Sequence, residues 1–139
     1  MGYDKIVSSE RLTFTCSPGT ASRARRLIKS FGAARLLEPG ISDMEAAVGE
    51  ALANSVEHGR ATEIEIRCSF DANDFIVELR DNGQGFDHPK SIDVKNLSLS
   101  PARTRGYGFQ IMRGMADDVT YSDGGRRLTL KKRLPRDGS

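Results

Sequence analysis

The sequence predicts a domain of mixed α/β class, because two different hydrophobic periods follow one another along the chain. Residues 17–31 and 42–59 repeat apolar side chains every three or four positions, the spacing of an amphipathic helix. Residues 10–16 show instead the two-residue alternation of a half-buried strand. The same alternation occurs on either side of a turn over 63–79 and again over 119–130, which predicts two β-hairpins.

Length and composition narrow the class of protein further. The 139 residues suffice for one domain with a real core and contain no linker-like stretch, so we expect a single domain over 1–139 with a disordered tail at 136–139. No apolar run approaches the ~20 residues needed to span a membrane, and no secretory signal begins the chain. We therefore expect a cytoplasmic protein without a membrane partner.

The charge of the chain gives no sign of a nucleic-acid partner. The formal net charge is only +2, and basic residues gather in two short clusters at 23–29 and 126–136. Such clusters are usually solvated faces of a fold, and no helix-turn-helix or RNA-binding signature accompanies them. We therefore expect no direct binding to nucleic acid.

The first strand and the first helix are predicted on either side of a Ser17-Pro18 break. One side of the strand carries three apolar residues, Leu12, Phe14 and Cys16. Ser17 can cap the following helix, with Pro18 at its first position. Cys16 and Cys68 lie among apolar neighbours without the spacing of a metal site, so both are predicted to be core residues that form no disulfide.

The second helix has a predicted signal at each end. Ser42 can cap the first turn while Glu45 reaches back to the backbone, which is the capping-box pattern, and Gly59 offers a left-handed stop. Helical spacing places small and apolar residues together on one side, namely Met44, Ala47, Val48, Ala51, Leu52, Ser55 and Val56. We therefore expect this side of the helix to be buried.

The opposite side of the helix carries Glu50 and Asn54, which stand one turn apart and could address a single ligand. A carboxylate beside an amide oxygen suits Mg²⁺, which prefers oxygen ligands, and it suits a base that orients a hydroxyl group or a water molecule. The alternative is an ordinary solvated polar face. The helix by itself does not decide between these two interpretations.

The first hairpin ends at an unusual polar position. Its second strand presents a row of apolar residues, Phe75, Val77 and Leu79, and the same face then carries Asp81. Gly83 and Gly85 follow directly, and glycine permits backbone geometry and close ligand approach that larger residues forbid. Taken alone, such a glycine pair is also typical of a simple turn.

A long polar segment, 87–104, follows and is expected to be either functional or disordered. Arg105-Gly106-Tyr107-Gly108 then leads into a short predicted helix with Phe109, Met112 and Met115. Backbone N–H groups at the start of such a helix can bind an anion, helped by the helix dipole. This glycine-rich stretch is therefore a candidate anion site.

These stretches occur in a particular order. Residues 50–59, then 81–85, then 105–109 together resemble the N, G1 and G2 boxes of the GHKL ATPase superfamily, and a domain of this size is most similar to bacterial anti-sigma factor serine/threonine kinases. The resemblance covers nearly the whole chain. It implies a two-layer α/β sandwich, with helices on one face of a mixed, mostly antiparallel sheet and ATP held between helices and a mobile lid.

The resemblance also implies a role for individual residues. Asp81 would accept a hydrogen bond from the adenine amino group beside Gly83 and Gly85, and Asn54 would hold Mg²⁺ at the phosphates. Glu50 would be the catalytic general base for a hydroxyl group of the protein substrate. The second glycine-rich stretch would surround the phosphates and bind the nucleotide through Arg105, Gly106, Tyr107, Gly108 and Phe109.

The implied partners are a sigma factor, which the protein would sequester, and a STAS-type antagonist protein, whose serine would receive the γ-phosphate of ATP. Relatives suggest a homodimer.

The alternative is a non-catalytic module that binds ATP and acts by sequestration alone. A histidine kinase or gyrase-like motor fits less well, because neither His58 nor His88 lies in a helical phosphoacceptor context, and His58 is expected to cap its helix or contact the lid. The chain departs from many relatives at Arg126-Arg127, where they carry Gly-Thr.

Overall fold

The computed structural model describes residues 8–17, 19–85 and 112–135. Its elements in chain order are strand β1 (Ser8–Thr15), helices α1 (Thr20–Gly32) and α2 (Gly40–Glu57), strands β2 (Glu63–Phe70), β3 (Asp74–Asp81) and β4 (Asp118–Ser122), the 3₁₀ turn η4 (Asp123–Gly125) and strand β5 (Arg127–Arg133). A further short helix covers Met112–Met115. The predicted hairpins are confirmed as β2–β3 and β4–β5.

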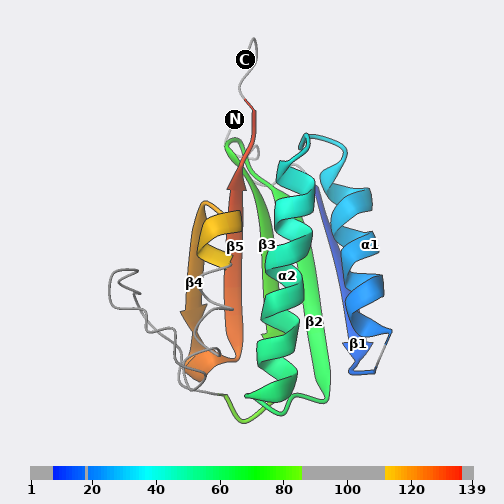
Figure 1. The fold of residues 1–139 in the computed structure, drawn as a ribbon, viewed down its shortest axis with the longest axis vertical. Coiled ribbons are helices and arrows are strands. Elements are labelled where there is room, and N and C mark those ends of the chain that lie inside the picture. Colours follow the sequence, from blue (N-terminus) through cyan, green and yellow to red (C-terminus); the bar gives the residue numbers. More distant parts are fainter. Residues whose placement is uncertain (1–7, 18, 86–111, 136–139) are drawn as a thin grey trace.

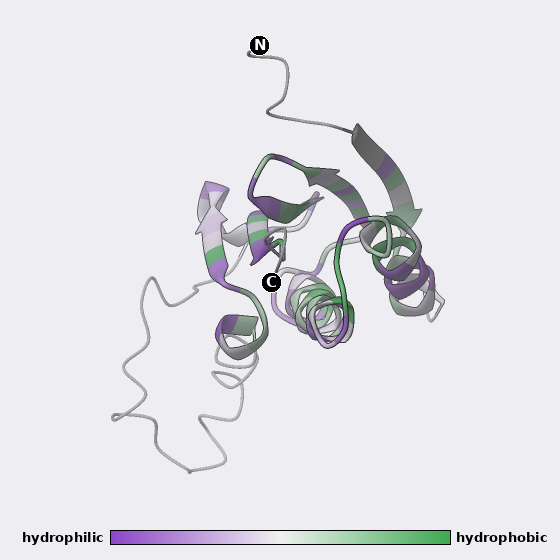
Figure 2. Cartoon of the chain, turned by 90° about the horizontal axis from the view of Figure 1, so that it is seen from above, coloured by the Kyte–Doolittle hydropathy of each residue, from purple (hydrophilic) through white to green (hydrophobic). Residues whose placement is uncertain are grey.

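The five described strands form one sheet in the order β1-β2-β3-β5-β4, and each neighbouring pair is antiparallel. Both long helices cover the same face of this sheet (Figure 1). A view from above shows the two layers, with the helices on one side and the curved sheet on the other (Figure 2). The two-layer α/β fold expected from the sequence is therefore confirmed.

The core lies between the sheet and the helices, where the alternating residues of the strands turn inward. Three phenylalanine rings meet near one end of it. Phe31 of α1 stacks on Phe70 with 5.0 Å between the ring centroids, and Phe70 lies 5.3 Å from Phe75 across the hairpin. Burying a side chain of this size stabilises a fold by roughly 1.5–3 kcal/mol. These rings tie the helix layer to the first hairpin.

The predicted buried side of α2 is confirmed except at one residue. Six of its seven members are buried, namely Met44, Ala47, Val48, Ala51, Leu52 and Ser55, whereas Val56 is 44% exposed. Leu12 was also predicted to face the core and is 39% exposed. Leu12 lies on β1, which is an edge strand, and Val56 lies in the last turn of α2. Periodicity gives the side of an element on which a residue lies, but not whether a neighbour extends far enough to cover it.

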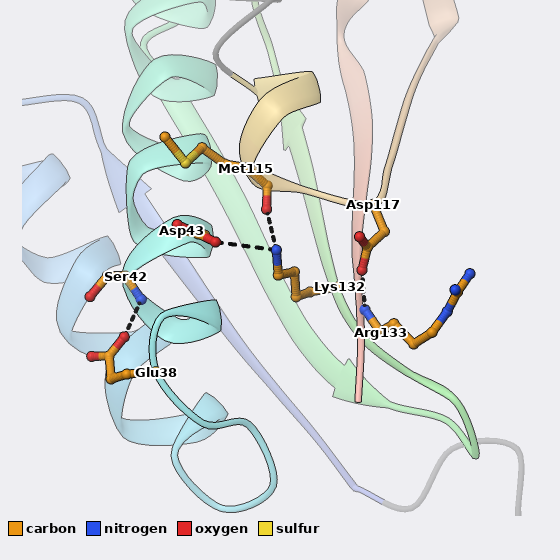
Figure 3. Close-up of polar contacts among 7 residues, drawn as sticks. All are labelled: Glu38, Ser42, Asp43, Met115, Asp117, Lys132 and Arg133. Carbon is orange, nitrogen blue, oxygen red and sulfur yellow. Dashed lines mark hydrogen bonds and ion pairs between the residues drawn. The ribbon is translucent and has the colours of Figure 1, made fainter. Parts of the chain in front are cut away.

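The capping-box prediction for α2 is wrong. The helix begins at Gly40, two residues before Ser42, and no side chain caps its first turn from the cap position. Instead, the backbone N–H of Ser42 donates to Oε1 of Glu38 at 2.9 Å (Figure 3). This hydrogen bond lowers the pKa of Glu38, because the N–H group stabilises the charged carboxylate. The acceptor that begins the helix is thus an acidic side chain upstream of it.

The cap predicted for α1 is also wrong. Helix α1 begins at Thr20, and its cap position is Gly19. Ser17 does not cap through its hydroxyl; its backbone N–H donates to Oγ1 of Thr20 at 2.9 Å, and that hydroxyl donates to the carbonyl of Thr15 at 3.1 Å. Thr20 therefore closes the turn between β1 and α1. Pro18 lies outside the described residues.

The end of α2 differs from the expected left-handed stop at Gly59. The helix ends at Glu57, and the left-handed residue is Arg60, with φ of 55°. Gly59 keeps contact with the helix, because its N–H donates to the carbonyl of Asn54 at 3.1 Å. Its own carbonyl accepts from Gln84 at 2.8 Å. Gly59 is therefore held by hydrogen bonds both to α2 and to the segment after β3.

Two further expectations concern composition. In the described part of the chain, no helix has both the length and the apolar character needed to cross a membrane. Cys68 is buried and Cys16 is half-buried, and they form no disulfide with each other. Burial raises the pKa of the Cys16 thiol, with smaller contributions from Asp81 and Glu63. The prediction that no disulfide links the two cysteines is confirmed.

Candidate functional site

The two glycines after β3 are required by the protein's own backbone. A Cβ atom added to Gly83 would lie 2.3 Å from the carbonyl oxygen of Gly59, at the end of α2. Gly85 has φ of 78°, and a Cβ atom there would lie 2.4 Å from the carbonyl oxygen of Gly124. The loop 81–85 therefore runs in close contact with the end of α2 on one side and with the β4–β5 turn on the other.

Asp81 is fixed at the end of β3 with one carboxylate oxygen already used. Its backbone N–H donates to the carbonyl of Arg126 at 2.9 Å, and its Oδ1 accepts from the N–H of Gly83 at 2.8 Å. The other oxygen, Oδ2, accepts no hydrogen bond from any residue in the described ranges. A half-buried carboxylate held in this way can accept one further hydrogen bond from a ligand.

Asn82 is a residue whose role we did not predict from the sequence. Its Oδ1 accepts from the backbone N–H groups of Thr62 and Glu63, both at 2.9 Å, and its Nδ2 donates to the hydroxyl of Thr62 at 2.9 Å. These three bonds hold the end of β3 against the start of β2. Asn between a strand and a glycine is a common local hydrogen-bonding residue, and that signal could have identified it.

Glu50 and Asn54 lie one turn apart on α2, as predicted, and both are half-buried. Glu50 makes no hydrogen bond or ion pair with the residues that the structure describes. Asn54 donates through Nδ2 to the phenol oxygen of Tyr121 on β4 at 3.4 Å. The carboxylate of Glu50 is thus available to a substrate, whereas the amide of Asn54 has one end engaged.

Tyr121 connects the two predicted binding residues and was itself missed. Burial raises the pKa of its phenol, the hydrogen bond from Asn54 lowers it, and the nearby Asp81 carboxylate raises it further, with a raised pKa as the result. Because Asn54 and Asp81 both affect the pKa of the Tyr121 phenol, the three side chains lie around one region. An inward-facing tyrosine in a strand needs a partner for its hydroxyl, and this need was the available signal.

The donor set suits a cation that arrives with a nucleotide and not an isolated metal ion. Among the described residues, no group of three or more histidine, cysteine, aspartate or glutamate side chains could hold a metal. Asn54 supplies a single amide oxygen. Mg²⁺ commonly keeps several water ligands and takes the remainder from phosphate oxygens and one or two protein oxygens. The amide oxygen of Asn54 therefore fits an Mg²⁺ ion whose other ligands would come from a nucleotide and water.

Several predicted site residues cannot be placed. Arg105, Gly106, Tyr107, Gly108 and Phe109 lie outside the described residues, as does the polar segment 87–104. His58 is described and occupies the cap position after α2, where its backbone N–H donates to the carbonyl of Asn54 at 3.0 Å. The expectation that His58 terminates the helix is therefore supported by its backbone.

Arg126 and Arg127 stand where many relatives were expected to carry Gly-Thr, and Arg126 is close to the site. Its guanidinium pairs with the carboxylate of Asp123 at 3.2 Å, within the same turn. The contribution of Arg126 to the site is its backbone carbonyl, which accepts the N–H of Asp81. In the described structure this position therefore supports Asp81 through the main chain.

Lys132 links the short helix at 112–115 to the rest of the fold. Nζ of Lys132 on β5 donates to the carbonyl of Met115 at 2.7 Å and pairs with Oδ2 of Asp43 on α2 at 3.3 Å (Figure 3). Beside it, the backbone N–H of Arg133 donates to Asp117 at 2.6 Å. These contacts join α2, β5 and the segment that follows residue 111.

A separate cavity of about 410 Å³ lies on the α1 side of α2. It is lined mainly by apolar groups of Cys16, Ala21, Leu52, Val56 and Ile64. Neither Asn54 nor Asp81 lines it. The cavity is therefore distinct from the polar region around Tyr121.

Comparisons with known proteins identify the family of the chain. A model of the histidine kinase-like ATPase domain family matches residues 14–132. The anti-sigma F factor of Clostridium botulinum is 31% identical over 102 residues, which cover 68% of this chain and 71% of that protein. The anti-sigma F factor of Clostridium perfringens is 27% identical over 135 residues, or 89% of this chain and 95% of that protein.

The fold is also similar to a solved structure. The crystal structure of the RsbU and RsbW domains of a Mycobacterium tuberculosis protein matches with a TM-score of 0.68 at 19% identity. The match covers 94% of this chain and 33% of that longer chain. At this identity the likeness shows a shared fold.

Proposed function

The chain belongs to the histidine kinase-like ATPase domain family, and from this premise we propose that it is an ATP-dependent serine/threonine kinase that regulates a sigma factor. It binds ATP with Mg²⁺, transfers the γ-phosphate to a serine of a STAS-type antagonist protein, and sequesters a sigma factor. The relatives named anti-sigma F factors support the sigma-factor part. As in the expectation from sequence, the active form is a homodimer in the cytoplasm.

The observation that carries the proposal is the placement of Asp81, Asn54 and Glu50. Asp81 stands at the end of β3 with Oδ2 available, between two backbone approaches that exclude side chains at Gly83 and Gly85. Asn54 is linked to the same region through Tyr121. This arrangement supports the assignment of the polar face of α2 to a binding site.

Each residue has a separate task in the proposed reaction. Oδ2 of Asp81 accepts the adenine amino proton, and the loop 81–85 offers a backbone surface to the base. Oδ1 of Asn54 holds Mg²⁺, which neutralises charge on the phosphates when bound. Glu50 accepts the proton of the substrate serine while the serine oxygen bonds to the γ-phosphorus. The bond from that phosphorus to the bridging oxygen breaks, and ADP leaves with the electron pair.

The nucleotide part of the proposal is tested by thermal melting with MgADP. Ligand at 100 times its Kd should raise stability by about 2.7 kcal/mol. Asp81→Asn should lose most of this gain, because the amide lacks the charge that strengthens the bond to adenine. An equal melting shift in wild type and Asp81→Asn would rule out the role of Asp81.

The kinase part is tested through Glu50. Glu50→Gln keeps the size of the side chain but removes the base, so it should bind ATP like wild type and transfer phosphate about 10²–10⁴ times more slowly. The measurement follows labelled γ-phosphate into an antagonist protein recovered by pull-down with MgATP. Glu45→Gln, the same change on the same helix, is the control and should retain activity.

A non-catalytic module is the second candidate, because the names of the relatives describe action on a sigma factor and not catalysis. In that case nucleotide would set the conformation and the protein would act by sequestration alone. Wild type would then bind ATP and a sigma factor but transfer no phosphate to any recovered partner. The same labelling experiment therefore separates the two candidates.

A further inference from the structure

We propose that Tyr121 is a positioning residue that holds the side-chain amide of Asn54 with its oxygen turned toward the cation of a bound nucleotide. The inference rests on the proposed function, because it concerns the Mg²⁺ assigned to Asn54. It adds a residue from β4, outside the N, G1 and G2 boxes, and it gives that residue a task other than packing.

The geometry of the amide is the starting point. Nδ2 of Asn54 donates to the phenol oxygen of Tyr121 at 3.4 Å, across 67 positions in the chain. Oδ1 and Nδ2 are bonded to the same trigonal carbon, so a contact that fixes one of them also fixes the other. With Nδ2 directed at Tyr121, Oδ1 is the end that β4 does not engage, and it accepts no hydrogen bond from any residue in the described ranges.

The orientation matters because the two ends of the amide differ chemically. Oδ1 carries lone pairs and can bind a cation, whereas the NH₂ group offers only donors and repels it. Turning the amide over about its last torsion exchanges these ends with little change in shape. An asparagine that serves a metal site therefore needs a partner that distinguishes nitrogen from oxygen.

A phenol can donate or accept, and toward Asn54 its oxygen is the acceptor, because the NH₂ group of the amide can only donate. The lone pairs of the Tyr121 oxygen therefore face Nδ2, and this contact favours the amide orientation in which the nitrogen is on the side of β4.

The test is Tyr121→Phe, which keeps the ring and removes the acceptor. ADP affinity is measured by calorimetry with Mg²⁺ and again with a chelator in place of Mg²⁺. We expect the gain in affinity that Mg²⁺ brings to fall by about two- to tenfold, the range for one neutral hydrogen bond, and Mg²⁺-free affinity to stay within about twofold. Thr120→Ala, on the neighbouring outward-facing position of β4, is the control and should leave both values unchanged.

A second comparison, made in a variant that carries Asn54→Asp, separates an effect on amide orientation from an effect on packing. A carboxylate has two equivalent oxygens and needs no partner to choose between them. In an Asn54→Asp background, Tyr121→Phe should therefore leave the Mg²⁺-dependent gain within about twofold, whereas lost packing would reduce affinity equally in both backgrounds. Equal losses in the two backgrounds would overturn the proposal.

A measurement on the wild-type protein covers the case in which Tyr121→Phe does not fold. The Nδ2 hydrogens of Asn54 should exchange with solvent more slowly than those of Asn73, which is exposed. Equal exchange rates would overturn the assignment. If wild type gains no ADP affinity from Mg²⁺, the proposed function itself fails; if it gains affinity and Tyr121→Phe gains as much, only the role of Tyr121 fails.

Discussion

The contact between Gly83 and the end of α2 yields a prediction whose sign is set by geometry. Gly83→Ala places a methyl group 2.3 Å from the carbonyl oxygen of Gly59 and 3.0 Å from Oδ1 of Asp81. Ordinary contact requires about 1 Å more, and the nearest atom belongs to the backbone, so it cannot turn away as a side chain would. The hydrogen bond from Gln84 to the same carbonyl, at 2.8 Å, must also be disturbed.

The size of the effect follows from the cost of overpacking, which is about 1–3 kcal/mol. For a chain of 139 residues, 1 kcal/mol corresponds to a change in melting temperature of about 3–5 °C. Gly83→Ala should therefore melt about 3–15 °C below wild type. Because the loop carries Asp81, the additional rise in melting temperature caused by MgADP should also be smaller in the variant than in wild type.

Gly49→Ala is a matched control that should change stability in the opposite direction. A Cβ atom at Gly49 meets no atom within 4 Å, and the residue lies inside α2. Alanine is favoured over glycine in a helix by about 0.8–1.0 kcal/mol, so the melting temperature should rise by a few degrees. The assay is differential scanning calorimetry with and without nucleotide. If Gly83→Ala melted at or above the wild-type temperature, the close approach of the two backbone segments would be refuted.

Three other predictions concern stability. The pKa of Glu38 is lowered in the fold, so its contribution to stability is present above about pH 4.5 and is lost as pH falls through the folded value. Glu38→Ala should therefore melt below wild type at pH 7, and the gap should narrow in acid melting curves as pH falls below about 4.5. The pKa of Tyr121 is raised in the fold, so above about pH 10 the unfolded chain loses the phenol proton more readily than the folded chain does. Wild type should therefore lose stability above this pH relative to Tyr121→Phe. A constant difference in stability between the two proteins from about pH 8 to 11 would contradict this. Lys132→Met leaves the Met115 carbonyl and Asp43 without their donor, and it should lower the free energy of unfolding in urea by about 1–3 kcal/mol. Lys131→Met is the control and should lower it by less than about 0.5 kcal/mol. Equal losses in the two variants would contradict the role of Lys132.

The order of motifs along the chain carried more information than any motif by itself. The glycine pair at Gly83 and Gly85 was compatible with a simple turn, and the structure indeed gives both glycines a structural reason for being there. A ligand-binding role does not conflict with that reason, because a loop packed against two backbone segments is also a rigid surface. The same backbone contacts that exclude a Cβ atom hold Asp81 in place.

Local patterns in the sequence determined the elements and the faces of this fold. The alternation in the first hairpin predicted β2 and β3, and six of the seven positions that the helical period predicted to be buried on α2 are buried. These succeed because strand and helix periods are properties of a few neighbouring residues. The functional expectations at Glu50, Asn54 and Asp81 came from the resemblance, which rests on residue types in order and needs no coordinates.

Tertiary structure decided which of several competent partners each polar group uses. Glu45 was predicted to accept the backbone N–H of Ser42, but the Glu38 carboxylate, upstream of the helix, accepts that hydrogen bond instead. Asn54 meets Tyr121 from 67 positions away, and Gly83 meets Gly59 from the other end of a hairpin. Hydrogen bonds and close contacts act over a few ångströms, whereas sequence spacing predicts distance only within one element. The partners of side chains that meet across elements are therefore determined by how the layers pack.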